Sequence, residues 1–188
     1  LCVFGLHYIY NYNFEFTCRV ASLWHSIFST IGAILFINNY ISIFSFHEVI
    51  KYNFVFILTD MYLYLTNKIS NIDIVQMIIH HIFFLIAIYI SKILPYFYAL
   101  GILSEASTIF LNTRWFAING YYFNNINFHT IIFWINFLIF RIFNMTYLLY
   151  LIYMSDYSKY IIVIIPFICL NYMWFYLLTL RILKKIKY

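Results

Sequence analysis

The chain has 188 residues, of which 65% are hydrophobic and 9% are charged, with a formal net charge of +5. Soluble domains carry about 25% charged residues, so this composition excludes an ordinary soluble domain and indicates an integral membrane protein. The positive charge does not indicate nucleic-acid binding, because part of it follows a hydrophobic segment, where basic residues mark topology and can contact anionic lipid: Arg181, Lys184, Lys185 and Lys187.

Six apolar segments separated by short connections predict an all-α, polytopic membrane helix bundle with six transmembrane helices, because a spanning backbone must satisfy its own hydrogen bonds. The predicted spans cover residues 20–41, 49–65, 74–91, 95–116, 129–154 and 160–183. Residues 1–18 are interpreted as the remnant of an N-terminal segment, and residues 19–188 as one transmembrane domain. The three cysteines show no metal or redox spacing.

In the first span, small and polar residues recur every three or four positions and share one helical face: Ser22, His25, Ser29 and Gly32. The small residues allow another helix to approach closely. His25 is either a hydrogen-bonded packing residue or a side chain that faces a polar cavity.

The second span places Asp60 near the middle of the membrane, in a seven-residue series with Asn53 and Asn67. An ionised carboxylate at that depth is costly. We therefore expect Asp60 to be protonated, paired or hydrated.

The third span carries His80 and His81 in apolar surroundings. Neighbouring helical residues point about 100° apart, so His80 shares a face with Asp73 and Gln76, whereas His81 joins Met77. We expect one ring to face a cavity and the other to orient it or contact a flanking helix. A zinc or iron site is the metal alternative, but the spacing that puts two histidine ligands on one helical face is absent, so no metal is expected.

The fourth span has the densest polar stripe, which ends at the membrane interface: Ser104, Glu105, Thr108, Asn112, Arg114 and Trp115. The fifth span places Arg141 near mid-membrane with Asn144 one turn on. A permanent guanidinium charge needs a carboxylate or carbonyl partner. An Arg141–Glu105 pair that fixes helix packing is therefore expected, with Asp60 as the other carboxylate deep enough to serve. The sixth span, with Asn171 and Thr179, is interpreted as scaffold.

Six spans leave both ends of the chain on one side of the membrane. Basic residues are the more numerous on that side, which favours cytosolic termini. They are Arg19, Lys68, Arg114, Arg181, Lys184, Lys185 and Lys187, against Lys51, Lys92 and Lys159 on the other side.

Four motifs together resemble the TLC-domain (TRAM/LAG1/CLN8) membrane protein family over roughly residues 18–183. They are Arg19-x-x-Ser22-x-x-His25, Thr59-Asp60, His80-His81, and Ser104-Glu105-x-Ser107-Thr108-x-Phe110-x-Asn112-x-Arg114-Trp115-Phe116. The last motif resembles the TLCD branch most closely. The resemblance implies a six-helix bundle around a lipid-accessible cavity, in the endoplasmic reticulum or another cellular membrane.

In the ceramide synthases of the wider family, the matching histidine pair takes part in transferring an acyl chain from acyl-CoA to a sphingoid amine. The acidic clusters that follow the pair in those enzymes are not present after His81, and Ile109 stands where TLCD-like proteins usually have proline. These departures favour a broader role in lipid composition or transport over sphingosine acylation.

The first hypothesis is a protein that handles lipids and influences membrane lipid composition, with acyl-CoA as co-substrate if it is an acyltransferase. His80, His81 and Asp60 are then the candidate catalytic residues, one histidine acting as general base or transient acyl acceptor. The candidate substrate-binding residues are His25, Glu105, Asn112, Arg114 and Arg141. The alternatives are a non-enzymatic lipid sensor or trafficking adaptor, a ceramide synthase-like N-acyltransferase, and a proton-relay transporter. Membrane lipids and acyl chains are the expected partners, and the oligomeric state stays open.

Overall fold

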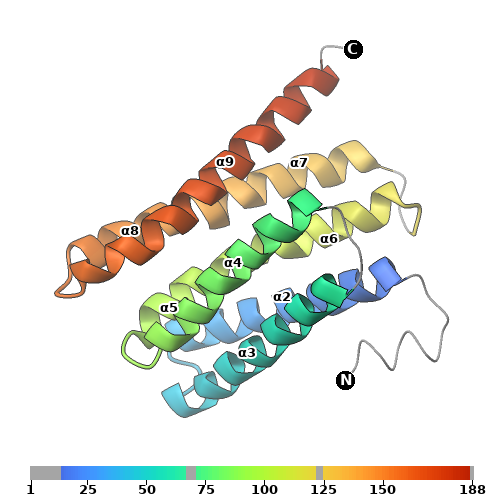
Figure 1. Cartoon of the computed structure of the whole chain (residues 1–188). Helices are drawn as coiled ribbons and strands as arrows, with labels where there is room; N and C mark the ends of the chain where they lie inside the picture. Colours follow the sequence, from blue (N-terminus) through green and yellow to red (C-terminus); the bar gives the residue numbers. More distant parts are fainter. Residues whose placement is uncertain (1–13, 67–70, 122–124, 187–188) are drawn as a thin grey trace.

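The computed structural model describes residues 14–66, 71–121 and 125–186, which are helical apart from short turns and contain no strand (Figure 1). This confirms the all-α bundle. The elements are α2 (Phe14–Ile37), α3 (Ile43–Thr66), α4 (Asn71–Ile90), α5 (Pro95–Ile102), η1 (Leu103–Glu105), α6 (Ala106–Ile118), α7 (Ile126–Phe137), η2 (Leu138–Phe143), α8 (Asn144–Tyr153), η3 (Ser158–Tyr160) and α9 (Ile161–Ile186). Residues 1–13, Asn67, Lys68 and Lys187 lie outside the described residues, as do the side chains of Asp73, Gln76, Lys184 and Lys185.

Each of the six predicted spans corresponds to a helical segment, but two of the segments change their helical type on the way. The fourth runs through α5, the 3-10 turn η1 and α6, and the turn ends at Glu105. The fifth runs through α7, the π-helical stretch η2 and α8, and η2 contains Arg141. Both irregular stretches therefore carry a buried charged residue of the predicted polar interior.

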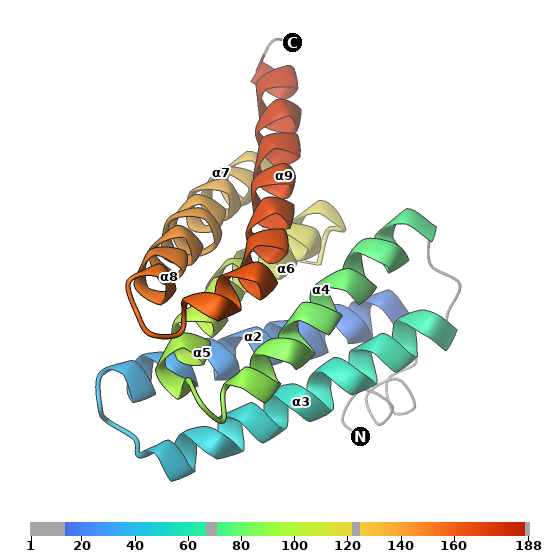
Figure 2. The same ribbon diagram turned by 60° about the vertical axis from the view of Figure 1, so that its left-hand side comes forward.

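The contacts between the six segments follow a closed order, and Figures 1 and 2 show their arrangement. Going round the ring, α2 packs on α3, α3 on α4, α4 on α9, α9 on α7, α7 on α6, and α6 on α2. Because the connections between consecutive segments are short, the two segments of each consecutive pair run antiparallel. Polar side chains on the inner faces of the six segments therefore point toward one shared interior.

Close approach of α2 and α3 depends on Gly32. A Cβ atom added at Gly32 would lie 2.8 Å from Cγ2 of Val49, so only glycine fits at this point of contact without movement of the neighbour. The predicted small-residue face of the first span is thus a helix contact.

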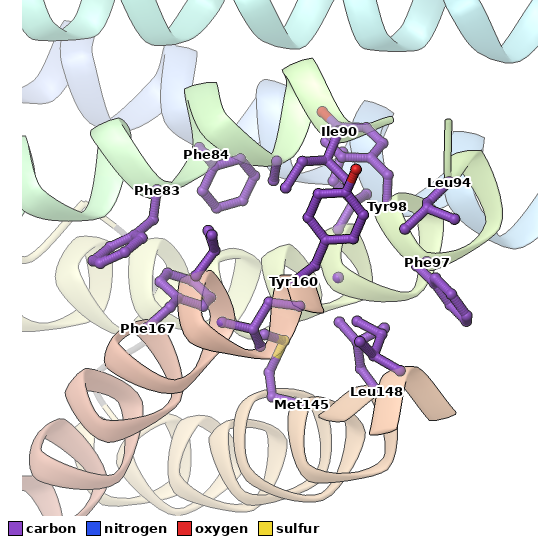
Figure 3. Close-up of a pocket in the computed structure, with 16 residues that line it drawn as sticks. Phe83, Phe84, Ile90, Leu94, Phe97, Tyr98, Met145, Leu148, Tyr160 and Phe167 are labelled. Atoms are coloured by element: carbon purple, nitrogen blue, oxygen red, sulfur yellow. The ribbon is translucent and has the colours of Figure 1, made fainter. Parts of the chain in front are cut away.

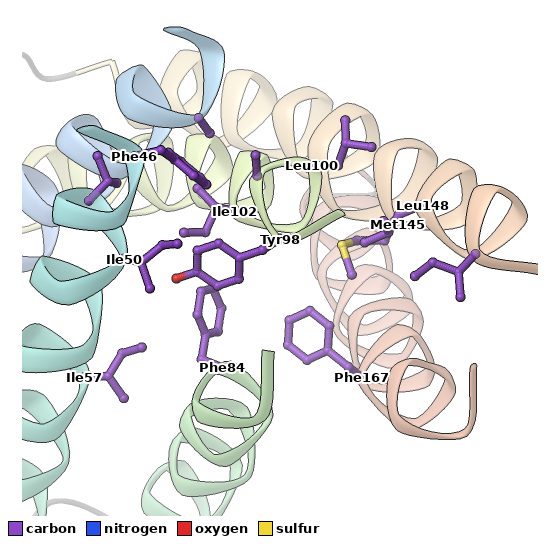
Figure 4. Packing of buried hydrophobic residues seen from close by; sticks show 14 of the residues in the cluster. Phe46, Ile50, Ile57, Phe84, Tyr98, Leu100, Ile102, Met145, Leu148 and Phe167 are labelled. Carbon is purple, nitrogen blue, oxygen red and sulfur yellow. The ribbon is translucent and has the colours of Figure 1, made fainter. Parts of the chain in front are cut away.

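The apolar core lies where α3, α4, α5, α8 and α9 converge (Figure 4). Its side chains include Phe46, Phe84, Tyr98, Ile102 and Phe167, all less than 9% exposed. The outer surface is also apolar, with large exposed side chains on every segment, as expected for helices that face lipid.

Within the described residues, three helical segments are long and apolar enough to cross a membrane: Glu15–Ile37, Ile126–Tyr153 and Ser158–Leu183. Met77–Ile90 is a shorter apolar helix. With the composition, these segments identify a membrane protein.

Candidate functional site

The main cavity lies inside the ring and has a volume of about 650 Å³. Side chains from all six helical segments line it, which follows from the closed packing order. Seven of the eight candidate site residues lie on its wall: His25, Asp60, His80, His81, Glu105, Arg114 and Arg141. Asn112 is fully buried and does not line it; its Nδ2 donates to Oγ of Ser22 at 3.1 Å, so it joins α6 to α2.

The two adjacent histidines have different surroundings. His81 contacts partners through both ring nitrogens: Nε2 lies 3.4 Å from Oδ2 of Asp60 on α3, and Nδ1 lies 2.6 Å from Sδ of Met77. The predicted placement of His81 beside Met77 is confirmed, and the flanking helix that it contacts is α3.

His80 has no hydrogen-bond partner for either ring nitrogen within the described residues, and its Nδ1 is buried. Its ring packs among aromatic side chains, with centroids 5.1 Å from Phe84, 5.4 Å from Phe167 and 5.8 Å from Trp174. His81 is therefore fixed by polar contacts, whereas His80 is positioned by packing and keeps its nitrogens unengaged.

His25 reaches the cavity from α2. Its ring stacks on Phe56 with centroids 3.8 Å apart, and its Nδ1 is buried without a hydrogen bond within the described part of the chain. Of the two interpretations of His25, the geometry therefore favours a side chain that faces the cavity over a hydrogen-bonded packing residue.

Arg141 is the centre of a buried polar network. Its Nη2 lies 3.6 Å from Oε1 of Glu105, and the side chains are 7% and 6% exposed, as the predicted pairing requires. Ser26 also donates to Glu105, at 3.4 Å. The guanidinium also donates from Nε to Oγ of Ser107 at 2.7 Å, from Nη2 to Oγ1 of Thr108 at 2.9 Å and from Nη1 to Oδ1 of Asn171 at 3.3 Å.

One residue differs from its sequence-based interpretation. Asn171 is not scaffold alone, because it supplies an acceptor to Arg141 from α9. Asn144, one turn from Arg141, donates from its Nδ2 to the backbone oxygen of Leu100 at 2.7 Å and so links α8 to α5. A buried guanidinium needs several acceptors, and that requirement was the only sequence signal for Asn171.

One end of the cavity is lined by arginines from three helices, Arg19 of α2, Arg114 of α6 and Arg181 of α9. Nε of Arg114 donates to Oγ1 of Thr130 at 3.0 Å, and the guanidinium of Arg19 lies 5.5 Å from the ring centroid of Trp115. These residues mark the end of the bundle where α2 and α7 begin and α6 and α9 end (Figure 1).

A second, almost wholly apolar pocket of about 90 Å³ lies between α4, α5, α8 and α9 (Figure 3). Phe84 lines both this pocket and the main cavity. Phe167, which packs against His80, also lines it. The arrangement thus runs from an arginine end, past the histidines, to an apolar pocket.

Within the described residues, no three His, Cys, Asp or Glu side chains converge as ligands for a metal ion. The cavity wall offers imidazole, carboxylate and guanidinium groups.

A family model described as the TLC domain matches residues 15–181. No curated protein and no solved structure matches the chain.

Proposed function

The chain belongs to the TLC-domain family, and from that premise we propose that it binds lipid chains between its helices and alters membrane lipid composition by acyl transfer. In this proposal it is a multi-pass protein of the endoplasmic reticulum or another cellular membrane, with cytosolic termini, and it is TLCD-like. Acyl-CoA is the acyl donor.

The asymmetry of the histidine pair carries the proposal. His80 lines a cavity of about 650 Å³; its Nδ1 is buried, which leaves Nε2 as the nitrogen that can react. His81 is held by Asp60 and Met77. A nucleophile or general base needs a ring nitrogen that has no hydrogen-bond partner, and neighbouring side chains must fix its position relative to the substrate. We assign the reacting role to His80 and a positioning role to the His81–Asp60 pair.

In the first step, Nε2 of His80 forms a bond to the thioester carbonyl carbon and the carbon–sulfur bond breaks, so that CoA leaves as a thiolate and an acyl-imidazolium remains. In the second step, an amine or hydroxyl of the lipid acceptor attacks the acyl carbon, the carbon–nitrogen bond to His80 breaks to restore the neutral imidazole, and the proton of the acceptor passes to the CoA thiolate. Phe84 and Phe167 place apolar surface beside the reacting ring, where the acyl chain can pass into the apolar pocket (Figure 3).

The test measures acyl transfer from acyl-CoA to candidate amine and alcohol lipids by the purified protein. Because positioned acid–base groups contribute about 10²- to 10⁴-fold, His80→Ala should lower turnover by at least about 10²-fold. His81→Ala and Asp60→Asn should lower it less, since they act through position. His47→Ala is the matched control, because His47 does not line the cavity. Unchanged turnover in His80→Ala would overturn the assignment.

A non-enzymatic lipid sensor or trafficking adaptor is the second candidate, and one observation favours it. Several polar side chains bond to each other across helices and not toward the cavity: Oγ of Ser29 donates to Asn53 at 2.6 Å, and Asn53 donates to Tyr98 at 3.2 Å. This candidate requires that His80→Ala lowers the unfolding temperature in detergent while the wild-type protein shows no acyl transfer with any donor.

A further inference from the structure

Among the side chains that the structure describes, the arginine end of the cavity carries more positive than negative charge. Four guanidinium groups line the cavity, those of Arg19, Arg114, Arg141 and Arg181, against two carboxylates, Asp60 and Glu105. Glu105 pairs with Arg141, and Asp60 lies beside His81. The excess positive charge therefore falls on the remaining three arginines.

Arg114 and Arg181 carry most of that excess. Neither takes part in an ion pair with any described residue, and Arg181 repels Arg114 electrostatically. Arg19 is partly compensated, because Glu15 lies 3.6 Å away and Asp60 also interacts with it. Two like charges held on facing helices over a cavity destabilise each other unless an anion lies between them.

We propose that this end of the cavity binds a phosphate group carried by an amphiphilic ligand. The inference rests on the proposed function, in that a lipid chain occupies the same cavity. Guanidinium groups match phosphate because they donate parallel hydrogen bonds to two of its oxygens. Arg114 is already oriented by Thr130 through Nε, which leaves its terminal nitrogens for the ligand.

The position of the arginines sets the direction of the ligand. They lie where α6 ends, α7 begins and α9 approaches its C-terminal end, whereas Phe84, farther inside, borders the apolar pocket. A ligand with phosphate at the arginines and its chain toward Phe84 passes His80 on the way. The phosphate belongs either to a water-soluble acyl carrier such as acyl-CoA or to the headgroup of a membrane phospholipid, and both share the chemistry that the arginines recognise.

The experiment compares binding of three palmitoyl compounds to the full chain in uncharged detergent: palmitoyl-CoA, palmitoyl lysophosphatidic acid and monopalmitoylglycerol. The two phosphate compounds should bind at least about tenfold more tightly than the glycerol ester, because hydrogen bonds to charged groups are the stronger class. Their affinity should fall as salt increases. Tighter binding of palmitoyl-CoA identifies the soluble carrier as the source, and tighter binding of lysophosphatidic acid identifies the membrane headgroup.

The variants are Arg114→Gln and Arg181→Gln, alone and together, with Lys51→Gln and Lys159→Gln as controls at the opposite end of the bundle. The double arginine variant should lose the preference for phosphate and keep its affinity for monopalmitoylglycerol, which shows that the fold is intact. Arg114→Lys should retain part of the preference.

Equal binding of all three compounds, or an unchanged preference in the double variant, would overturn the phosphate site. That failure is distinct from failure of the proposed function, since acyl transfer would still depend on His80. Conversely, a phosphate preference in a protein without acyl transfer would overturn the catalytic proposal alone.

Discussion

Arg141 is buried in an apolar bundle, and its guanidinium is compensated from three other elements. Glu105 of η1 supplies the charge, Ser107 and Thr108 of α6 supply hydroxyl acceptors, and Asn171 of α9 supplies an amide oxygen. The rings of Phe137 and Trp174 lie 5.4 and 5.9 Å from the guanidinium carbon. Because a buried charge without partners is far more costly than a buried pair, the members of this network depend on each other.

The first prediction concerns this pair. Arg141→Met should lower the free energy of unfolding by about 3 to 5 kcal/mol, because it leaves the Glu105 carboxylate buried without its cation. Arg141→Met combined with Glu105→Gln should be more stable than the single variant, since both charges are then gone. Thermal and denaturant unfolding of the purified protein in detergent measure the difference. If the double variant is no more stable than Arg141→Met, the unpaired Glu105 carboxylate is not the cause of the lost stability.

For individual residues, the sequence predicted the main interactions but not every partner. The Arg141–Glu105 pair followed from depth and charge alone, and the different neighbours of His80 and His81 followed from helical geometry. The role of Asn171 and the unengaged state of His80 did not follow, because they depend on how α9 is rotated against α4 and η2. Nothing local in an apolar helix specifies that rotation.

Among the elements, the positions of the six helical segments were predictable and their internal irregularities were not. Apolar runs separated by polar or turn-forming residues indicate where a span begins and ends. The 3-10 turn at Leu103–Glu105 and the π-helical stretch at Leu138–Phe143 contain no glycine or proline that would signal them. They follow from tertiary packing, since each brings one member of the buried ion pair into the interior.

The second prediction concerns the contact between α2 and α3. In Gly32→Ala, the new Cβ would lie 2.8 and 3.0 Å from the two methyl groups of Val49. A β-branched side chain has little rotamer freedom to move aside, and overpacking of this kind costs about 1 to 3 kcal/mol. Replacing Val49 by Ala in the same protein should restore part of the lost stability.

Gly101→Ala is the matched control for this prediction. Its new Cβ would meet only Cδ2 of Leu148, at 3.6 Å, which is an ordinary contact distance. Both substitutions gain the same helix propensity of about 1 kcal/mol, so the difference in unfolding temperature between them measures the Val49 contact. Equal stability of the two variants would show that α2 and α3 can separate without cost.

For the whole molecule, closure of the ring produces the site. No single segment has more than a few polar side chains on its inner face, yet the packing order brings residues from all six to one cavity. The sequence predicted the number of helical segments and the general set of polar residues. The apolar pocket and its shared boundary at Phe84 were not predictable, because apolar residues occur on every face of these helices.

The third prediction concerns orientation in the membrane. The N-terminal end of α2 and the C-terminal ends of α6 and α9 lie at the same end of the bundle, and the turn between α4 and α5 lies at the other end (Figures 1 and 2). Asn119 and Lys92 are exposed residues at these two positions. Because basic residues of the sequence are more numerous at the arginine end, we expect that end to lie in the cytosol.

Single cysteines at these positions test the orientation in sealed endoplasmic reticulum vesicles whose cytosolic face is outward, after Cys2, Cys18 and Cys169 are replaced by Ser. A membrane-impermeant maleimide should label Asn119→Cys in intact vesicles and Lys92→Cys only after detergent is added. The reverse pattern would place the arginine end in the lumen, where cytosolic acyl-CoA does not reach it. Labelling of both in intact vesicles would mean that the one helical segment between residues 92 and 119 does not cross the membrane, which would contradict the predicted topology.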